Sequence, residues 1–113
     1  MTSPDITAVA TYPQLRHLID LRAIGWTFQP IVDDNGVNQV YGFRHWPGGW
    51  IDLLIIHHLT NTAAARATHD GHLVWTREGG FIEVIDHLAD LPAPHEPLAP
   101  TLVIGRVPTL WTQ

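Results

Sequence analysis

The stretch from Phe43 to Asn61, FRHWPGGWIDLLIIHHLTN, decides the fold of this chain. Its Pro47-Gly48-Gly49 run is a turn signal, because proline presets the backbone and glycine accepts left-handed conformations. The run from Ile51 to Ile56 that follows is apolar at nearly every position, which is typical of a central strand buried on both faces. The stretch therefore predicts a β-hairpin at the centre of a sheet.

A three-residue loop at Pro47-Gly48-Gly49 predicts the pairing of the two strands. The pairs are Trp46 with Trp50, Arg44 with Asp52, Gly42 with Leu54, Val40 with Ile56, Phe43 with Leu53, and Tyr41 with Ile55. Aromatic and opposite-charge cross-strand pairs stabilise a sheet by roughly 0.2–1 kcal/mol each, so an aromatic pair and a salt bridge explain this hairpin end without catalysis. A two-residue loop would instead pair His45 with Asp52, giving a carboxylate-oriented imidazole. We expect the structural arrangement.

Further strands and helices are expected on both sides of the hairpin. Five strands joined by tight turns are predicted at residues 26–32, 37–46, 50–59, 62–68 and 72–77. Because proline cannot donate to a sheet ladder, Pro30 places the first strand at an edge. A capped amphipathic pattern predicts a helix over residues 13–24, which Gly25 ends. A second helix is predicted by a stripe at helical spacing, made of Phe81, Val84, Ile85, Leu88 and Leu91.

These elements predict an α+β fold: an antiparallel meander sheet of about five strands, flanked by an N-terminal and a C-terminal helix. Residues 1–10 are expected to be a flexible arm and residues 11–91 a single domain. Residues 92–113 are expected to be a stiff proline-rich linker followed by an apolar tail that docks as an extended strand or swaps onto a partner. Since the helices cover one face of the sheet, the other face must be covered by the tail, by curvature of the sheet or by another subunit.

Composition narrows the classes of function. The chain has 113 residues with a net charge of −5, and its six basic residues are all arginines scattered along the sequence. Nucleic-acid binding is therefore not expected, because it needs clustered cations. The absence of cysteine excludes disulfides and thiolate catalysis. With no membrane-length apolar run and no secretory signal, we expect a soluble cytoplasmic protein, and the lysine-free composition suggests a GC-rich bacterial genome.

The residues that could bind a metal or take part in catalysis give only weak evidence for either function. His57 and His58 point to opposite faces of one strand, so they cannot both bind one ion unless the strand bulges. Either histidine would need His45, His69 or His72 as a further metal ligand. The helical pair Glu83 and His87 is expected to be a surface contact. Since the chain has no lysine and a single serine, covalent catalysis is not predicted. No cofactor is predicted either.

Three hypotheses of function remain. The first is a small non-catalytic protein-interaction module of adaptor, chaperone or immunity type, which binds a protein partner or itself as a homodimer; its interface candidates are Tyr41, Phe43, Leu53, Ile55 and Trp111. The second is a small-ligand-binding or acid–base enzyme domain with a tryptophan-lined pocket, whose candidates are Arg44, Trp46, Trp50 and Asp52. The third is a histidine-based metal-binding protein. We favour the first.

Overall fold

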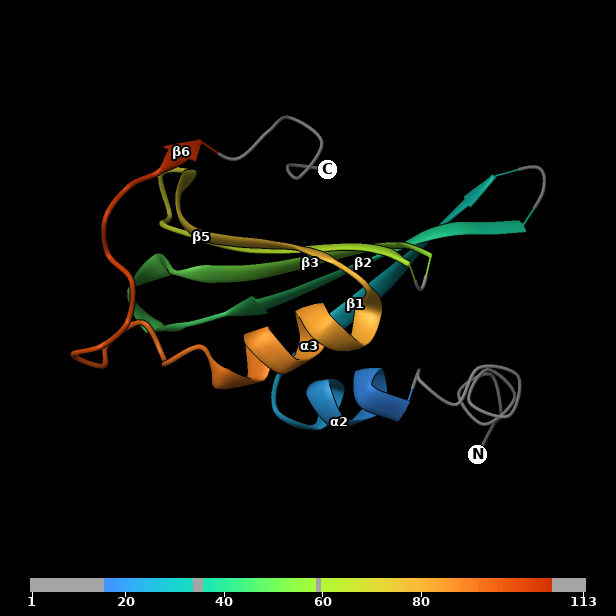
Figure 1. Cartoon of the computed structure of the whole chain (residues 1–113), viewed down its shortest axis with the longest axis horizontal. Coiled ribbons are helices and arrows are strands. Elements are labelled where there is room, and N and C mark those ends of the chain that lie inside the picture. The colour runs from blue at the N-terminus through green and yellow to red at the C-terminus, as the bar shows by residue number, and fades with distance from the viewer. Residues whose placement is uncertain (1–15, 34–35, 59, 107–113) are drawn as a thin grey trace.

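A single antiparallel sheet organises the computed structural model, which describes residues 16–33, 36–58 and 60–106. Six strands follow one another in the sheet in chain order, and two helices lie on one side of it (Figure 1). The elements are α2 (Arg16–Ala23), β1 (Thr27–Asp33), β2 (Gly36–His45), β3 (Ile51–His58), β4 (Asn61–Ala67), β5 (His72–Gly79), α3 (Phe81–Asp90) and β6 (Gly105–Arg106). The predicted α+β class and antiparallel sheet are confirmed, and β6 adds a sixth strand to the five expected.

The central hairpin has the predicted register. Arg44 pairs with Asp52, Phe43 with Leu53 and Tyr41 with Ile55 across β2 and β3, and the other strand pairs agree. The loop is a single 3-10 turn, Pro47–Gly49, closed by a 2.8 Å hydrogen bond from the Trp46 N–H to the Trp50 carbonyl. Gly48 and Gly49 each have φ of 84°, a conformation that favours glycine. The alternative pairing of His45 with Asp52 is wrong, because His45 lies opposite Ile51.

Helix α2 ends as the sequence predicts. Gly25 has φ of 115°, and its N–H donates to the Arg22 carbonyl, while the N–H of Trp26 donates to the Leu21 carbonyl. These two bonds form the Schellman motif, in which a left-handed glycine lets the last carbonyls of a helix find donors. Leu21 and Trp26 also join the same hydrophobic cluster, so the turn delivers the chain directly into β1. The predicted start of this helix, residues 13–15, lies outside the described residues.

The main core lies between the helices and one face of the sheet. Leu54 and Ile56 of β3 meet the α3 stripe there, and Phe81, Val84, Ile85 and Leu88 are all buried as predicted. His17 of α2 makes an edge contact with Phe81 of α3 at a ring separation of 6.3 Å, so the helices also touch each other. Burying each large apolar side chain contributes about 1.5–3 kcal/mol, which makes this layer the main source of stability.

A glycine in β2 makes room for an aromatic stack over the sheet. The rings of Trp26 and Phe28 lie parallel, with centroids 6.0 Å apart. Phe28 pairs with Gly42, and a Cβ atom at position 42 would come within 2.4 Å of the Phe28 ring. Gly42 is therefore required by the close approach of this ring. The strand that carries Phe28 is an edge strand, as Pro30 predicts.

The other sheet face is already shielded within one chain. Leu53 is 9% exposed and Ile55 is 2% exposed, although both point away from the cluster formed by Leu54 and Ile56. Alternate residues of a strand point to opposite faces, so the doubly apolar β3 is buried on both sides, as expected of a central strand. A second subunit is therefore not needed to remove Leu53 and Ile55 from water.

The segment after α3 departs from the predicted extended linker. Two successive turns bend it, with hydrogen bonds from the Glu96 N–H to the Ala93 carbonyl and from the Ala99 N–H to the Glu96 carbonyl. Pro94 and Ala99 are buried. Figure 1 shows the segment running from the end of α3 around one end of the sheet to β6, which pairs with β5. The residues expected to form the arm (1–10) and the end of the tail (107–113) lie outside the described residues.

Candidate interaction surface

Asp52 forms its ion pair with a residue that the sequence analysis did not select. Its carboxylate accepts two hydrogen bonds from Arg66 of β4: Nε lies 2.6 Å from Oδ1, and Nη2 lies 3.0 Å from Oδ2. Asp52 and Arg66 are direct neighbours in the register of β3 and β4. The predicted salt bridge of Asp52 with Arg44 is replaced by this bidentate pair, even though Arg44 does lie opposite Asp52 on β2.

The Trp46 side chain contacts both Asp52 and Arg44. Its indole N–H donates to Oδ2 of Asp52 at 2.9 Å. The guanidinium carbon of Arg44 lies 3.9 Å from the centre of the Trp46 ring, in a cation–π contact. The pocket candidates Arg44, Trp46 and Asp52 are thus brought together, and Trp50 lies across the turn from Trp46. The hydrogen bond of Trp46 with Asp52 and the cation–π contact of Arg44 with Trp46 stabilise this end of the hairpin.

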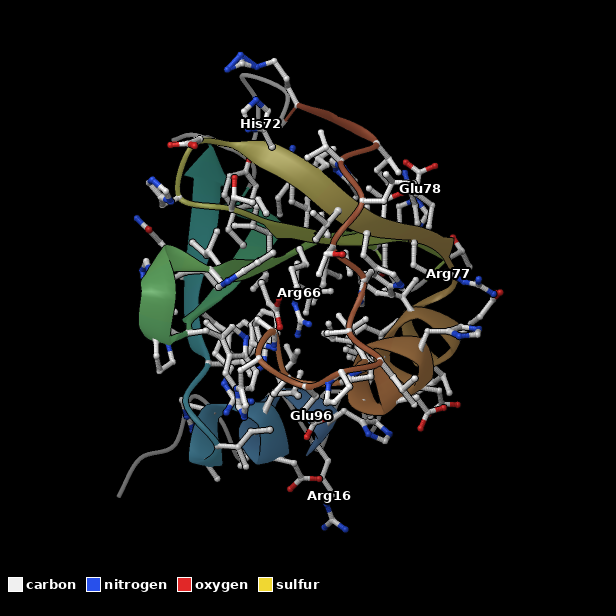
Figure 2. All side chains as sticks on the ribbon, turned by 90° about the vertical axis from the view of Figure 1, so that its left-hand side faces the viewer. Arg16, Arg66, His72, Arg77, Glu78 and Glu96 are labelled. Atoms are coloured by element: carbon white, nitrogen blue, oxygen red, sulfur yellow. The ribbon has the colours of Figure 1, made fainter. Side chains whose placement is uncertain are left out.

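The pair of Asp52 and Arg66 is buried and fully bonded. Asp52 is 3% exposed and Arg66 is 1% exposed. The third group of the guanidinium, Nη1, donates to the carbonyl of Pro92, just beyond α3. Figure 2 shows Arg66 between the strands and the segment that follows α3. Both carboxylate oxygens of Asp52 therefore accept hydrogen bonds from within the fold.

This network sets the path of the chain after α3. The bond from Arg66 to the Pro92 carbonyl fixes the start of the segment against β4, and the two turns from Ala93 to Ala99 redirect it towards β6. At its far end the N–H of Ile104 donates to the Leu73 carbonyl at 2.8 Å. The segment is therefore held at both ends by hydrogen bonds to the sheet.

Between these two anchors the segment presents apolar side chains to solvent. Four of the seven residues from position 98 to 104 are large apolar residues with high exposure: Leu98 at 88%, Leu102 at 78%, Val103 at 52% and Ile104 at 58%. We call these four residues the C-terminal ridge. Single exposed apolar residues are ordinary, but a run of them marks an interaction site or an aggregation risk. The ridge is therefore the candidate functional surface.

Four of the predicted interface residues lie together on one face of β2 and β3, and they are less exposed than the ridge. Tyr41 and Phe43 are half-buried, and the register brings them beside the buried Ile55 and Leu53 on one face. Phe43 also makes an edge contact with His45, at a ring separation of 5.6 Å. These four residues are each less exposed than any residue of the ridge. Trp111, the fifth predicted interface residue, lies outside the described residues.

The histidines do not converge on a metal site in the part of the chain that the structure describes. No group of three or more His, Asp or Glu side chains there has an arrangement that could hold an ion. His58 contacts the Thr60 hydroxyl at 2.6 Å, and His69 lies 2.9 Å from its neighbour Asp70 on the surface. These contacts are local.

The helical pair of Glu83 and His87 is bridged by a strand residue. Nη2 of Arg77, on β5, lies 2.7 Å from Nε2 of His87 and 3.8 Å from Oε1 of Glu83. Arg77 pairs with Ala64, which belongs to the core under the helices, so the Arg77 side chain lies on the same face of the sheet as α3. The cluster is largely exposed and joins α3 to the sheet, which makes it a surface contact of the fold.

Comparisons with family models, with curated proteins and with solved structures find no match for this chain. Among the described residues, no helix has the length and apolar character needed to cross a membrane.

Proposed function

We propose that this protein is a small non-catalytic protein-interaction module that binds a protein partner through the C-terminal ridge. The observation that carries this proposal is the exposure of Leu98, Leu102, Val103 and Ile104 within one short segment. Domains of this size rarely leave neighbouring large apolar side chains in water unless another surface covers them. Covering the ridge would add the hydrophobic stabilisation that the isolated chain does not obtain from these residues.

The anchoring of the segment supports binding. Arg66 holds the Pro92 carbonyl at one end, and Leu73 holds the Ile104 N–H at the other. A segment that is already ordered loses less conformational entropy when it binds than a free tail would. The stretch from Pro97 to Gly105 also contains no charged residue, so covering it would bury no charge.

The hydrogen bonding of Asp52 supports the non-catalytic part of the proposal. The carboxylate of Asp52, the best acid–base candidate of the sequence, accepts bonds from Arg66 and Trp46. Breaking the ion pair to free this carboxylate would leave a charge buried without a partner, which costs about 3–5 kcal/mol. A structural role for Asp52, Arg66 and Trp46 keeps the ion pair intact and avoids this loss of free energy.

Site-specific photo-cross-linking in the cells that make the protein tests this function. A benzophenone side chain replaces Leu102 in one variant and Ile82 in the control, because Ile82 is an exposed apolar residue of α3 outside the ridge. We expect a discrete protein adduct from position 102 and little from position 82. Equal labelling at both positions, or no adduct at position 102, would overturn the proposal.

A further inference from the structure

We infer that residues 107–113 of this chain, VPTLWTQ, cover the face of the sheet opposite the helices, with Trp111 as the main apolar contact. This face contains Leu53 and Ile55 of β3 with Ala65 and Ala67 of β4, and we call it the outer face. The inference concerns a contact within one chain and does not depend on the C-terminal ridge. Three observations support it: the burial of the outer face, the elements around it and the position at which β6 ends.

The outer face is buried although half of it is built from alanine. The register of β3 and β4 pairs Leu53 with Ala65 and Ile55 with Ala63, on the opposite face from the helix-side core. Ile55 is 2% exposed, Ala65 is 1% exposed and Ala67 is fully buried. Since an antiparallel sheet with one uncovered face leaves that face in water, burial of this kind requires a further layer above it.

The described elements do not supply that layer. Helices α2 and α3 lie on the opposite side of the sheet, and the segment after α3 passes around one end of it (Figure 1). Beside the outer face, Tyr41 and Phe43 of β2 are half-buried, and Thr76 of β5, the partner of Ala65, is exposed. Side chains at the margins therefore leave the centre open, so the layer comes from residues beyond the described ranges.

Among those residues, the C-terminal segment begins beside the outer face. Residues 107–113 follow β6, which pairs with β5, and β5 lies next to β4. Residues 1–15 instead lead into α2, on the helix side of the sheet. The remaining gaps, 34–35 and 59, are one or two residues long and lie in hairpin turns. The position of β6 therefore favours the C-terminal segment over the N-terminal one.

The length and chemistry of the segment also fit the outer face. Neighbouring strands are about 4.8 Å apart, so β3 lies about 14 Å from β6 across the sheet. The five residues from Val107 to Trp111 span about 16 Å when extended, which is enough to bring Trp111 over β3 or β4. Pro108 favours a change of direction directly after β6. Residues 107–113 contain no charged side chain, so covering the outer face with them buries no charge.

This contact changes the role of the interface residues predicted from the sequence. Tyr41, Phe43, Leu53 and Ile55 become the binding surface for Trp111 of the same chain, and a tryptophan supplies the large apolar area that small neighbours lack. The surface that remains for a protein partner is then the C-terminal ridge.

Photo-cross-linking in dilute purified protein tests the inference. A benzophenone side chain replaces Trp111 in one variant and Tyr12 in the control, because both are aromatic residues outside the described ranges. Peptide mapping by mass spectrometry locates each adduct. We expect position 111 to attach to the outer face or to Tyr41 or Phe43 at its margin, in a product with the 12.6 kDa mass of one chain. Position 12 should attach elsewhere.

Three results would overturn the inference. An adduct from position 111 with twice the mass of one chain would mean that a second copy supplies the layer. An adduct from position 12 on the outer face would assign the layer to the N-terminal segment. Without an adduct from position 111 on the outer face or its margin, residues 107–113 would not be the layer.

Truncation gives an independent measurement of the same contact. A chain that ends at Arg106 leaves the outer face in water, so we expect its midpoint of thermal unfolding to fall by roughly 5 °C or more, whereas removal of residues 1–10 should change it by less than about 1 °C. If the shorter chain fails to fold, Trp111→Ser and Tyr12→Ser in the full chain give the matched comparison. Equal shifts for the two ends would contradict the inference. Because these experiments use purified protein, their failure would leave the adduct at Leu102, and with it the proposed function, unaffected.

Discussion

The two ends of one segment show opposite arrangements of polar and apolar groups. At Pro92 the segment meets Arg66 and Asp52, charged residues that are buried and hydrogen-bonded. At Leu102 and Ile104 the same segment exposes large apolar side chains. Buried charges with complete partners hold the chain in place, while exposed apolar groups gain free energy when another surface covers them. The first end therefore serves stability, and we assign the second to binding.

The largest effect is expected from breaking the buried ion pair. Asp52→Asn keeps the size of the side chain but leaves the Arg66 guanidinium without its counter-charge. Because an unpaired buried charge is strongly unfavourable, we expect the free energy of unfolding to fall by about 3–5 kcal/mol. Urea denaturation followed by tryptophan fluorescence measures this change.

The matched control for that variant is Asp70→Asn. Asp70 lies 2.9 Å from His69, and 58% of its side chain is exposed. Exposed pairs of this kind contribute about 0–1 kcal/mol. If Asp52→Asn and Asp70→Asn destabilise the protein equally, the central role of the buried pair is contradicted.

A smaller effect is expected at Trp46. Trp46→Phe keeps an aromatic ring but removes the indole N–H that donates to Asp52 at 2.9 Å. Hydrogen bonds to charged groups contribute about 1.5–3 kcal/mol, and we expect a loss of this size in urea denaturation. Trp50→Phe is the control, because no side-chain hydrogen bond of Trp50 is seen among the described residues. Equal losses would mean that ring packing alone matters at this turn.

Substitutions at two strand glycines compare the core with the edge strand β6. At Gly42, an added Cβ would lie 2.4 Å from the Phe28 ring, whereas at Gly105 its nearest neighbour is a Leu73 methyl carbon at 3.9 Å. We expect Gly42→Ala to lower the free energy of unfolding by about 1–3 kcal/mol through overpacking. Gly105→Ala should change it by less than about 0.5 kcal/mol. Thermal unfolding of both variants measures these changes. A larger loss of stability for Gly105→Ala than for Gly42→Ala would contradict the packing described for Gly42.

The smallest effect on stability is expected in the ridge itself. Leu102→Ser replaces a side chain that is 78% exposed, so we expect the free energy of unfolding to change by less than about 0.5 kcal/mol. The amount of ammonium sulfate needed to precipitate the protein should rise, because less apolar surface is presented to neighbours. Clear destabilisation in urea would show that Leu102 belongs to the core.

Local patterns in the sequence predict much of this fold. The Pro47-Gly48-Gly49 loop fixes the pairing of β2 with β3, since a three-residue turn leaves one register for the flanking residues. Gly25 predicts the end of α2, and the stripe beginning at Phe81 predicts the buried face of α3. In each case the residues that decide the structure are neighbours in sequence, so the conformation follows from turn and helix geometry.

The candidate site is harder to predict because its contacts are distant in sequence. Arg66 stands among alanines in β4, and its partners Asp52 and Pro92 come from β3 and from beyond α3. A lone arginine in a strand of small residues was the available signal, since a charge on a buried strand requires a partner. The exposure of the ridge depends on how the segment turns after Pro92. The apolar sequence alone suggested burial.

Site-specific photo-cross-linking at Leu102, with the mass of the adduct as the readout, tests the central claim most directly. We expect a discrete protein adduct at Leu102 and little at the control position Ile82, which is an exposed apolar residue outside the ridge. No adduct at Leu102, or equal labelling at both positions, would contradict the claim that the ridge binds a protein.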